Sequence, residues 1–254
     1  MKKLFAAAAL AAALWSHPAG AAGEAPTPPA VDWSFNGLFG TFDRAQLQRG
    51  YQVYAEVCHS CHALKFMAFR NLQQIGFTPE QIAQLAGQFE VQDGPNDEGD
   101  MFMRPAKAAD HMPSPFANEK AARFANNGAY PPDQSLIVEA RKGGSDYIHA
   151  LMIGYRDPPP EGVQLGDGMY FNEYFPGHQI AMAPPLSDGR VDYTDGTEAT
   201  LDQQAKDVTA FLTWVAEPNL EQRKRMGVTV MLFLIVLTGM LYALKRHIWS
   251  DVKH

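Results

Sequence analysis

Cysteine is scarce in this chain of 254 residues, which contains only Cys58 and Cys61. A structural zinc site usually takes four ligands of the Cys or His type, and no second cysteine pair exists to complete one. The alternation of strands and helices in which a thioredoxin-like cysteine pair occurs is also missing from the sequence. The two cysteines are therefore expected to belong to a site that uses a single closely spaced cysteine pair.

Arginine is absent from the first 22 residues, where a mitochondrial transit segment would be rich in it. Instead, two lysines precede an apolar run over 4–14, and Ala19-Gly20-Ala21 fits an A-x-A cleavage site. These features predict a bacterial secretory signal peptide over residues 1–21, with cleavage after Ala21 or Ala22. The apolar run is too short for a retained membrane anchor.

Charged residues are missing from positions 227–244, a run of 18 residues. A helix of that length spans about 27 Å, close to the roughly 30 Å hydrocarbon core of a bilayer. We predict a transmembrane anchor over 223–246, with a buried core helix as the alternative. If the N-terminus is exported, residues 22–222 form a periplasmic domain and 247–254 a cytoplasmic tail. The protein is then a single-pass protein of the bacterial cytoplasmic (inner) membrane.

Positive charge is scarce between the signal peptide and the anchor. The chain carries −7, and subtracting the two leader lysines and the net +5 of residues 223–254 leaves −14 for the part between them. Such a charge argues against nucleic-acid binding and suits fast encounter with a basic partner. Ordinary solubility is the alternative for each of the two acidic stretches: Asp93, Asp97, Glu98 and Asp100, and further on Asp188, Asp192, Asp195, Glu198 and Asp202.

The chain does contain the sequence Cys58-His59-Ser60-Cys61-His62. C-x-x-C-H is the attachment signature of c-type haem. Each thiol adds to one vinyl group of the porphyrin, and the adjacent histidine ligates the iron. A redox dithiol does not need that histidine. We therefore predict one covalently bound haem (heme c), with a redox dithiol or a structural disulfide as the alternatives.

Local patterns predict a mainly α fold, a c-type cytochrome domain with long loops. A helix capped by Asp43 carries apolar residues at helical spacing and ends at the haem motif. Thr78-Pro79-Glu80-Gln81 opens another helix, which Gly87 ends. Further helices are expected at 132–142, 147–152 and 201–217, the last packing against the helix ahead of the motif, with irregular structure over 88–131 and a loop with short strands over 157–185.

Several side chains after the motif could supply the sixth ligand of the iron. A thioether in that position favours reduced iron and raises the potential. Met182 is favoured because its neighbours in Ala181-Met182-Ala183-Pro184-Pro185 are small, which permits close approach, and because the prolines stiffen the chain. The other candidates are Met101, Met103, Met112, Met152, Met169, His111, His149 and His178. Phe66, Met67 and Phe69 are expected to pack against the haem or in the core.

A series of further motifs follows in order along the chain. They are Asn126-Asn127-Gly128-Ala129, Pro131-Pro132-Asp133, Arg141, Gly143-Gly144, Asp146-Tyr147, Tyr170-Phe171-Asn172, Tyr174-Phe175-Pro176-Gly177, Ala205-Lys206-Asp207-Val208, Ala216-Glu217-Pro218 and Arg223-Lys224-Arg225-Met226-Gly227. With C-x-x-C-H and the Met182 segment, this series resembles the cytochrome c1 family in its bacterial form. The resemblance covers nearly all of the chain after the signal peptide, and it is far more specific than C-x-x-C-H alone.

The resemblance implies roles for individual residues. Cys58 and Cys61 would carry the haem, and His62 and Met182 would be the axial ligands of its iron. Pro132 would pack on the haem face, and the neighbours of the haem propionates would be Asn126, Arg141 and Tyr147. Some bacterial members have an additional cysteine pair in their distal loops, which this chain lacks, so rigidity near Met182 must come from prolines or packing.

The resemblance also implies a function. The protein would be the electron-transfer subunit of a cytochrome bc1 complex (ubiquinol:cytochrome c oxidoreductase), dimeric by family resemblance, with cytochrome b and the Rieske iron-sulfur protein as partners. It would pass one electron from the Rieske protein through its haem to a periplasmic cytochrome c, and it needs no catalytic acid or base of its own. The alternatives are a membrane-anchored haem sensor or peroxidase-like protein and a membrane-anchored dithiol oxidoreductase.

Overall fold

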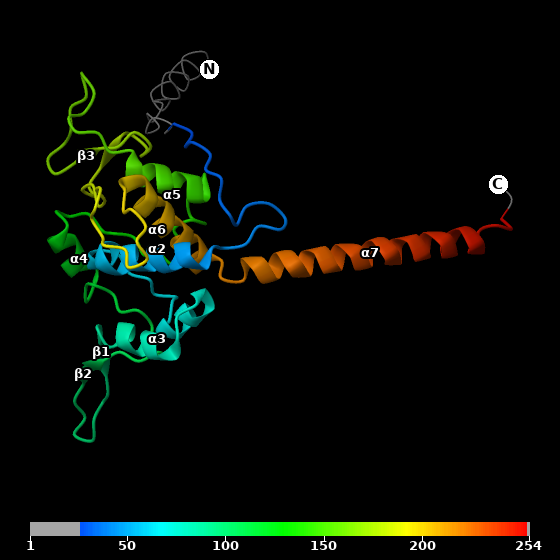
Figure 1. The fold of residues 1–254 in the computed structure, drawn as a ribbon, viewed down its shortest axis with the longest axis horizontal. Coiled ribbons are helices and arrows are strands. Elements are labelled where there is room, and N and C mark those ends of the chain that lie inside the picture. The colour runs from blue at the N-terminus through cyan, green and yellow to red at the C-terminus, as the bar shows by residue number, and fades with distance from the viewer. Residues whose placement is uncertain (1–25, 253–254) are drawn as a thin grey trace, which may run out of the picture.

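The computed structural model describes residues 26–252, so the predicted signal peptide lies outside the described residues. A helical domain forms one end of the molecule, and one long helix, α7, leaves it (Figure 1). Strands are few and short in the described part of the chain, which confirms the predicted mainly α class. The helices are α2 (Arg44–Glu56), η1 (Cys58–Ser60), η2 (Phe69–Ile75), α3 (Pro79–Ala86), α4 (Glu119–Ala125), α5 (Gly144–Ile153), α6 (Leu201–Ala216) and α7 (Leu220–Ile248).

Helices α2 and α6 pack against each other at the centre of the domain, as the sequence predicts. Asp43 caps α2 by accepting a hydrogen bond of 2.9 Å from an amide of its first turn. The two helices approach closely at Gly50, where a Cβ atom would lie 2.1 Å from the carbonyl oxygen of Asp207. Tyr54 and Phe211 are fully buried, with ring centroids 5.9 Å apart. The helix that ends at the haem motif is therefore held by the core itself.

Helix α3 begins and ends where its sequence signals predict. Thr78 accepts a hydrogen bond from the amide of Gln81, and the Gln81 side chain accepts one from the amide of Thr78, which forms a capping box. The helix ends at Gly87. The side chains of Thr78 and Gln81 therefore fix the start of α3, and its end coincides with the glycine that the sequence analysis named.

An antiparallel hairpin of β1 (Glu90–Asp93) and β2 (Phe102–Pro105) follows α3 and projects from the domain (Figure 1). The hairpin and α4 both lie within 88–131, for which the sequence analysis expected irregular structure. That expectation is wrong for these two elements. The strands are four residues long and mostly exposed, and they lack the alternation of apolar and polar residues by which a strand is recognised.

Residues 132–142 were predicted to form a helix, and this prediction is wrong, because the segment is a series of turns. A single helix-like bond occurs there, from the amide of Ala140 to the carbonyl of Leu136. Earlier in the segment, the amide of Gln134 donates to the carbonyl oxygen of Ala63 at 2.9 Å. The segment thus combines isolated turn bonds, such as that from the amide of Ile137 to the carbonyl oxygen of Gln134, with a bond to a distant part of the chain, and it does not form a continuous helix.

Residues 157–185 form the predicted loop with short strands, β3 (Tyr170–Phe171) and β4 (Gln179–Ile180), which pair antiparallel. The buried Asn172 donates from its side chain to the carbonyl oxygen of Leu151 at 2.8 Å and so ties this loop to α5. Helix α5 covers the predicted 147–152 and begins a few residues earlier.

The three apolar side chains after the motif differ in their surroundings. Met67 and Phe69 lie in the core, as expected, whereas Phe66 is 70% exposed. Core packing is therefore the wrong expectation for Phe66. Its exposed ring is one of several large apolar side chains on the surface of the domain.

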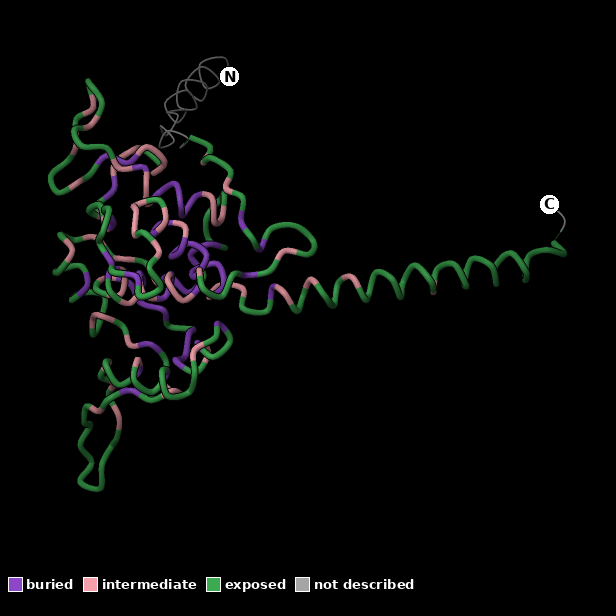
Figure 2. Tube along the Cα trace, viewed as in Figure 1, coloured by how far each residue is buried: buried purple, intermediate pink, exposed green. Residues whose placement is uncertain are grey.

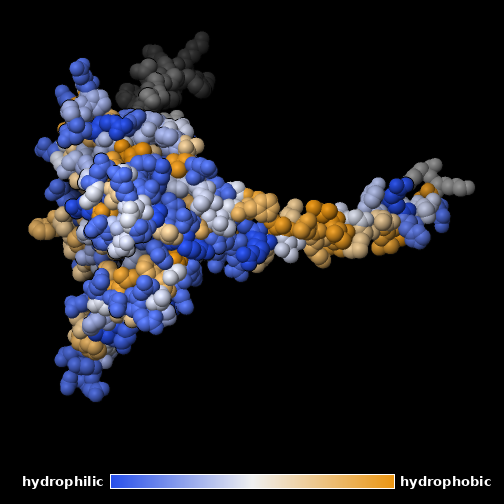
Figure 3. Space-filling model, in the orientation of Figure 1, coloured by the Kyte–Doolittle hydropathy of each residue, from blue (hydrophilic) through white to orange (hydrophobic). Residues whose placement is uncertain are grey.

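Helix α7 is the one helix within residues 26–252 that is long and apolar enough to cross a membrane. Its surface is exposed along nearly its whole length (Figure 2). Apolar side chains occupy its middle, and hydrophilic side chains occupy both ends (Figure 3). A buried core helix, the alternative considered for this segment, is excluded, because none of its most apolar stretch is buried in the domain.

Candidate functional site

The C-x-x-C-H motif forms one tight turn at the end of α2. The helix ends at Val57, and the chain continues as the short 3-10 turn η1. The amides of Cys61 and His62 both donate to the carbonyl oxygen of Cys58, at 3.1 and 2.9 Å. The two thiols and the imidazole therefore come from a single compact turn fixed to the central helix pair.

Both cysteines of this turn are free thiols, which argues against the structural disulfide. Burial, followed by the proximity of Cys61, raises the pKa of the Cys58 thiol to about 12. Thiol–disulfide exchange needs a thiolate, and redox-active cysteines have lowered pKa values. The pKa of the Cys58 thiol is raised instead of lowered, which argues against a redox dithiol.

The imidazole of His62 is buried, and its Nδ1 lies 2.8 Å from the carbonyl oxygen of Pro132. A carbonyl oxygen only accepts, so Nδ1 carries the proton and the lone pair of the neutral ring is on Nε2. Burial lowers the pKa of His62, which favours this neutral form. Such a histidine is oriented and protonated as a metal-ligating imidazole has to be.

Residues 132–135 run beside residues 62–66 and hold the motif from outside it. The Asp133 carboxylate accepts from the amide of Lys65 at 3.0 Å and from the amide of Ser135 at 2.9 Å. The Ser135 hydroxyl accepts from the amide of Phe66 at 3.1 Å. Together with the bonds of Pro132 and Gln134 described above, this segment forms a second support for the motif, independent of α2.

Tyr54 is a further support, which the sequence analysis placed in the helix but not at the site. Its hydroxyl donates to the carbonyl oxygen of His62 at 2.9 Å and lies 3.1 Å from Nδ1 of His59. Its spacing on the helix marks it only as a core residue. The signal that identifies its role is its position one turn before Cys58, which is visible once the turn is known.

Met182 lies on a different part of the chain, next to a group of tyrosines. It is partly buried against the core, and its carbonyl oxygen accepts a hydrogen bond of 3.0 Å from the hydroxyl of Tyr155. Burial raises the pKa of Tyr155, and the nearby Tyr147 and Tyr170 raise it further. The Tyr155 bond fixes the backbone at Met182, so the segment does not depend on its prolines alone.

Tyr147 and Arg141, two of the expected propionate neighbours, lie close to each other. Burial raises the pKa of the Tyr147 hydroxyl, and the positive charge of Arg141 acts in the opposite direction. Tyr147 is buried on α5, while Arg141 is exposed and its guanidinium donates to the carbonyl oxygen of the neighbouring Ala140. The structure thus brings Arg141, Tyr147 and the Met182 segment together on one side of the domain.

Asn126 ends helix α4, and its side chain donates to the carbonyl oxygen of Ala122 at 2.7 Å. The following Asn127 and Gly128 have positive φ angles, so the chain turns sharply. A Cβ atom at Gly168 would lie 3.5 Å from the Asn127 side chain. This turn therefore lies beside the 157–185 loop that leads to Met182.

Several alternative sixth ligands are used elsewhere in the fold. His149 is bonded through Nε2 to Asp202 at 2.9 Å. Nδ1 of His111 is bonded to the carbonyl oxygen of Lys65 at 2.9 Å, which leaves its Nε2 available as in His62 and does not exclude it. Met101 and Met103 are exposed on or beside the projecting hairpin. Met112, Met152, Met169 and His178 are not excluded by their contacts.

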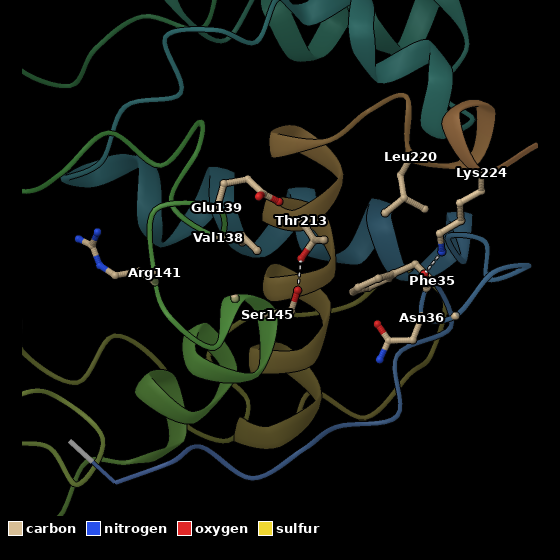
Figure 4. Close-up of a pocket in the computed structure, with 11 residues that line it drawn as sticks. Phe35, Asn36, Val138, Glu139, Arg141, Ser145, Thr213, Leu220 and Lys224 are labelled. Carbon is tan, nitrogen blue, oxygen red and sulfur yellow. Dashed lines mark hydrogen bonds between the residues drawn. The ribbon is translucent and has the colours of Figure 1, made fainter. Parts of the chain in front are cut away.

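A cavity of about 390 Å³ lies away from the C-x-x-C-H turn. It opens between the N-terminal loop, α6 and the start of α7 (Figure 4). The hydroxyls of Ser145 and Thr213 bond to each other across it at 2.9 Å. Arg141 contributes to its rim but extends away from the other labelled side chains. Neither cysteine nor histidine lines this cavity, so it is not the site of the motif's chemistry.

The residues of the C-x-x-C-H turn fit a covalently attached haem. Two free thiols and a buried imidazole with Nε2 available come from one turn. A bare metal ion does not fit, because no three His, Cys, Asp or Glu side chains converge anywhere in the described part of the chain. This turn could supply two thioether attachments to a haem and one nitrogen ligand to its iron.

Comparison with known proteins agrees with this donor set. The model of the Cytochrome C1 family matches residues 33–252. This chain belongs to the cytochrome c1 family. Members of this family carry a covalently bound c-type haem. They are the haem electron-transfer subunit of the cytochrome bc1 complex, and this chain has the same role.

Individual relatives are similar over most of the chain. The protein named cytochrome c1 from Rhodospirillum rubrum is 52% identical over 238 residues, which cover 88% of each chain. The mitochondrial heme protein cytochrome c1-2 from Solanum tuberosum is 48% identical, with 89% of this chain and 86% of that protein covered. A protein named cytochrome b/c1 from Bradyrhizobium diazoefficiens is 50% identical, and the match covers 36% of its length. The cytochrome c1 unit is thus shared by bacterial and mitochondrial proteins.

Proposed function

We propose that this chain takes one electron at a time from the Rieske iron-sulfur protein and passes it to a cytochrome c in the periplasm. Its haem supplies a carrier whose iron alternates between two oxidation states. The observation that carries the proposal is the orientation of His62: its Nδ1–H bond to Pro132 leaves Nε2 for the iron, in the turn that holds Cys58 and Cys61. No side chain is required to act as an acid, base or nucleophile.

In this proposal, Cys58 and Cys61 form the thioether bonds and His62 and Met182 are the axial ligands. Met182 is supported by its partial burial and by the Tyr155 bond that fixes its backbone. Arg141 and Tyr147 would be neighbours of the haem propionates.

Asn126 and Pro132 complete the proposed haem surroundings. Asn126 lies next to Asn127, at the turn beside the 157–185 loop, and would be a neighbour of a haem propionate. The carbonyl oxygen of Pro132 accepts a hydrogen bond from His62 and so orients the proposed ligand imidazole. A role for Pro132 as a positioning residue adds to the packing role that the family resemblance implies.

The proposed topology has a cleaved signal peptide over 1–21, a periplasmic domain over 22–222, an anchor over 223–246 and a cytoplasmic tail over 247–254. Helix α7 supports it, because it is continuous from Leu220 to Ile248 and basic residues flank its uncharged middle. The proposed partners are cytochrome b and the Rieske protein within a dimeric complex in the inner membrane.

The proposed docking surface for the acceptor is acidic. The tip of the β1–β2 hairpin carries Asp97, Glu98 and Asp100, none of which forms an ion pair within the described residues. Figure 1 places the hairpin on the part of the domain away from the exit of α7. In the second stretch, Asp195 and Asp202 pair with Arg49 and Lys206. Three carboxylates in each stretch therefore form no ion pair within the described residues, and the hairpin tip is preferred because it projects from the domain.

The experiment that tests the function follows single electrons through the purified complex. After a pulse of quinol, the haem should be reduced only when the Rieske centre is present, and added cytochrome c should reoxidise it. A haem sensor or peroxidase-like protein would instead bind carbon monoxide when reduced, because its sixth position would be open. Reduction of the haem without the Rieske centre, or carbon monoxide binding to the native protein, would contradict the proposal.

A further inference from the structure

The loop over residues 33–42 presents apolar side chains to the outside. Leu38 is 60% exposed and Phe39 is 80% exposed, whereas Trp33, Phe35 and Phe42 at the base of the loop are buried. None of the ten residues is charged. The loop is thus anchored in the core at both ends, and its tip is apolar, which is unfavourable in water.

The backbone of this loop holds the tip away from the domain. The amide of Thr41 donates to the carbonyl oxygen of Ser34 at 3.0 Å and closes the base. Gly37 has a φ of +70°, and a Cβ atom at Gly40 would lie 2.0 Å from the carbonyl oxygen of Asn36. This close turn needs glycine at both positions. The Thr41–Ser34 hydrogen bond and the two glycines therefore hold the tip away from the domain surface.

The first turn of α7 is bonded directly to this loop. The ammonium of Lys224 donates to the carbonyl oxygen of Phe35, as Figure 4 shows, and lies 3.4 Å from that of Gly40. The Glu221 carboxylate accepts from the amide of Phe42 at 2.8 Å. In Figure 1 the loop bulges on the side of the domain from which α7 leaves. The loop and the start of α7 thus form one unit.

Distances along α7 place this unit at the membrane surface. Lys224 is three residues before the uncharged run 227–244, about 4.5 Å along the helix axis. The polar interfacial layer on each side of a bilayer is roughly 5–8 Å thick, which is half the difference between total and hydrocarbon thickness. The base of the loop is therefore level with the lipid headgroups.

We propose that Leu38 and Phe39 insert into the boundary between lipid headgroups and acyl chains beside α7. This inference depends on α7 being the membrane span. The occupant of the surface is lipid, because the loop is uncharged, continuous with the membrane helix and at headgroup height. The haem domain then contacts the membrane at two points, the span and the loop, which fixes its tilt.

The test places a fluorescent label on Phe39→Cys in the purified complex reconstituted in nanodiscs. Because the haem occupies Cys58 and Cys61, the new cysteine is the only free thiol of this subunit, and labelled complex is compared with unsubstituted complex. Quenching by lipids that carry a nitroxide near the headgroup should exceed quenching by aqueous iodide several-fold. Phe124→Cys, at a position that is 93% exposed on α4, is the control and should show the reverse order.

Two results overturn the proposal. Quenching by iodide as strong as at the control position would place the tip in water. Protection from both quenchers would mean that another subunit covers it. A label at Leu234→Cys in the middle of α7 should be quenched by nitroxides deep in the acyl chains. Its failure would contradict the span itself, so the two failures are distinguishable.

Discussion

The Nδ1 atom of His62 and the carbonyl oxygen of Pro132 are hydrogen-bonded at 2.8 Å although 70 positions separate the two residues in the sequence. The orientation of the proposed axial imidazole is therefore set by a segment outside the C-x-x-C-H motif. A hydrogen bond from the ring nitrogen that does not bind the metal fixes the tautomer and the ring orientation of metal-ligating histidines. Haem ligation and the docking of residues 132–135 are thus coupled.

Asp133→Ala tests this coupling. The substitution removes the acceptor of the Lys65 and Ser135 amides, and we expect a loss of about 1–2 kcal/mol in the free energy of unfolding. The looser segment should also broaden the low-spin haem signals in electron paramagnetic resonance. Glu161→Ala, on an exposed loop, is the matched control. Unchanged stability and unchanged spectra in Asp133→Ala would mean that the segment does not support the histidine.

Cys58→Ala and Cys61→Ala should weaken or abolish the retention of haem under denaturing conditions, because each removes one thioether bond. The measurement is haem staining of a denaturing gel at equal protein loading. Ser60→Ala lies between the two cysteines and bonds only within the turn, so it should keep full staining. Full staining of both cysteine variants would rule out covalent attachment at this turn.

Met182→Leu should lower the haem potential, because the thioether that favours reduced iron is lost. The sulfur-to-iron absorption band of the oxidised protein should disappear with it. Met152→Leu, at a partly buried position on α5, is the control and should retain both the potential and the band. If Met182→Leu keeps the band, another side chain is the sixth ligand.

Neutralising the hairpin tip as Asp97→Asn, Glu98→Gln and Asp100→Asn together should slow the second-order reaction with a basic cytochrome c and flatten its salt dependence. The Debye length falls from about 10 Å at 0.1 M salt to about 3 Å at 1 M, so native and variant rates should converge at high salt. Asp192→Asn with Glu198→Gln is the comparison in the second acidic stretch. If the second-order rate falls only in this comparison variant, the acceptor docks at the second acidic stretch and not at the hairpin tip.

The junction of the hairpin with the domain should loosen in acid. Arg104 bonds to Asp93 and Asp110, and its hydrogen bond lowers the pKa of Asp110 to about 2. A carboxyl group with a lowered folded-state pKa stabilises the fold above its unfolded pKa, and this contribution is lost as the pH falls through the folded value.

Hydrogen exchange of the β1–β2 amides, corrected for the intrinsic pH dependence, should therefore reveal lower protection between about pH 4 and about pH 2. Arg104→Gln removes the pairing, so its protection should be lower at neutral pH and change less over this interval. The same pH profile in the variant and the native protein would show that the pairing does not hold the hairpin.

Elements whose signals are local could be predicted from the sequence. Asp43 and the Thr78–Gln81 capping box fix the starts of α2 and α3 because their side chains bond to amides two or three residues away. The uncharged run of α7 is equally local. These elements depend on neighbours that are visible in any short window of the sequence.

The missed features depend on distant parts of the chain. Residues 132–142 carry helix-forming residues, but Gln134 bonds to Ala63 and the segment is not a helix. The contacts of Tyr54 with the motif and the bond from Tyr155 to Met182 likewise follow from tertiary packing. The family motifs identified residues such as Pro132 without indicating that its carbonyl oxygen is the contacting group.

The link between α6 and α7 has only three residues, 217–219, and Glu221 and Lys224 bond the start of α7 to the N-terminal loop. The described residues contain no long flexible linker between the haem domain and α7. A domain attached in this way cannot move back and forth between two partners. Any travel during electron delivery must be made by the donor and the acceptor, and their docking and release would then govern how often the protein turns over.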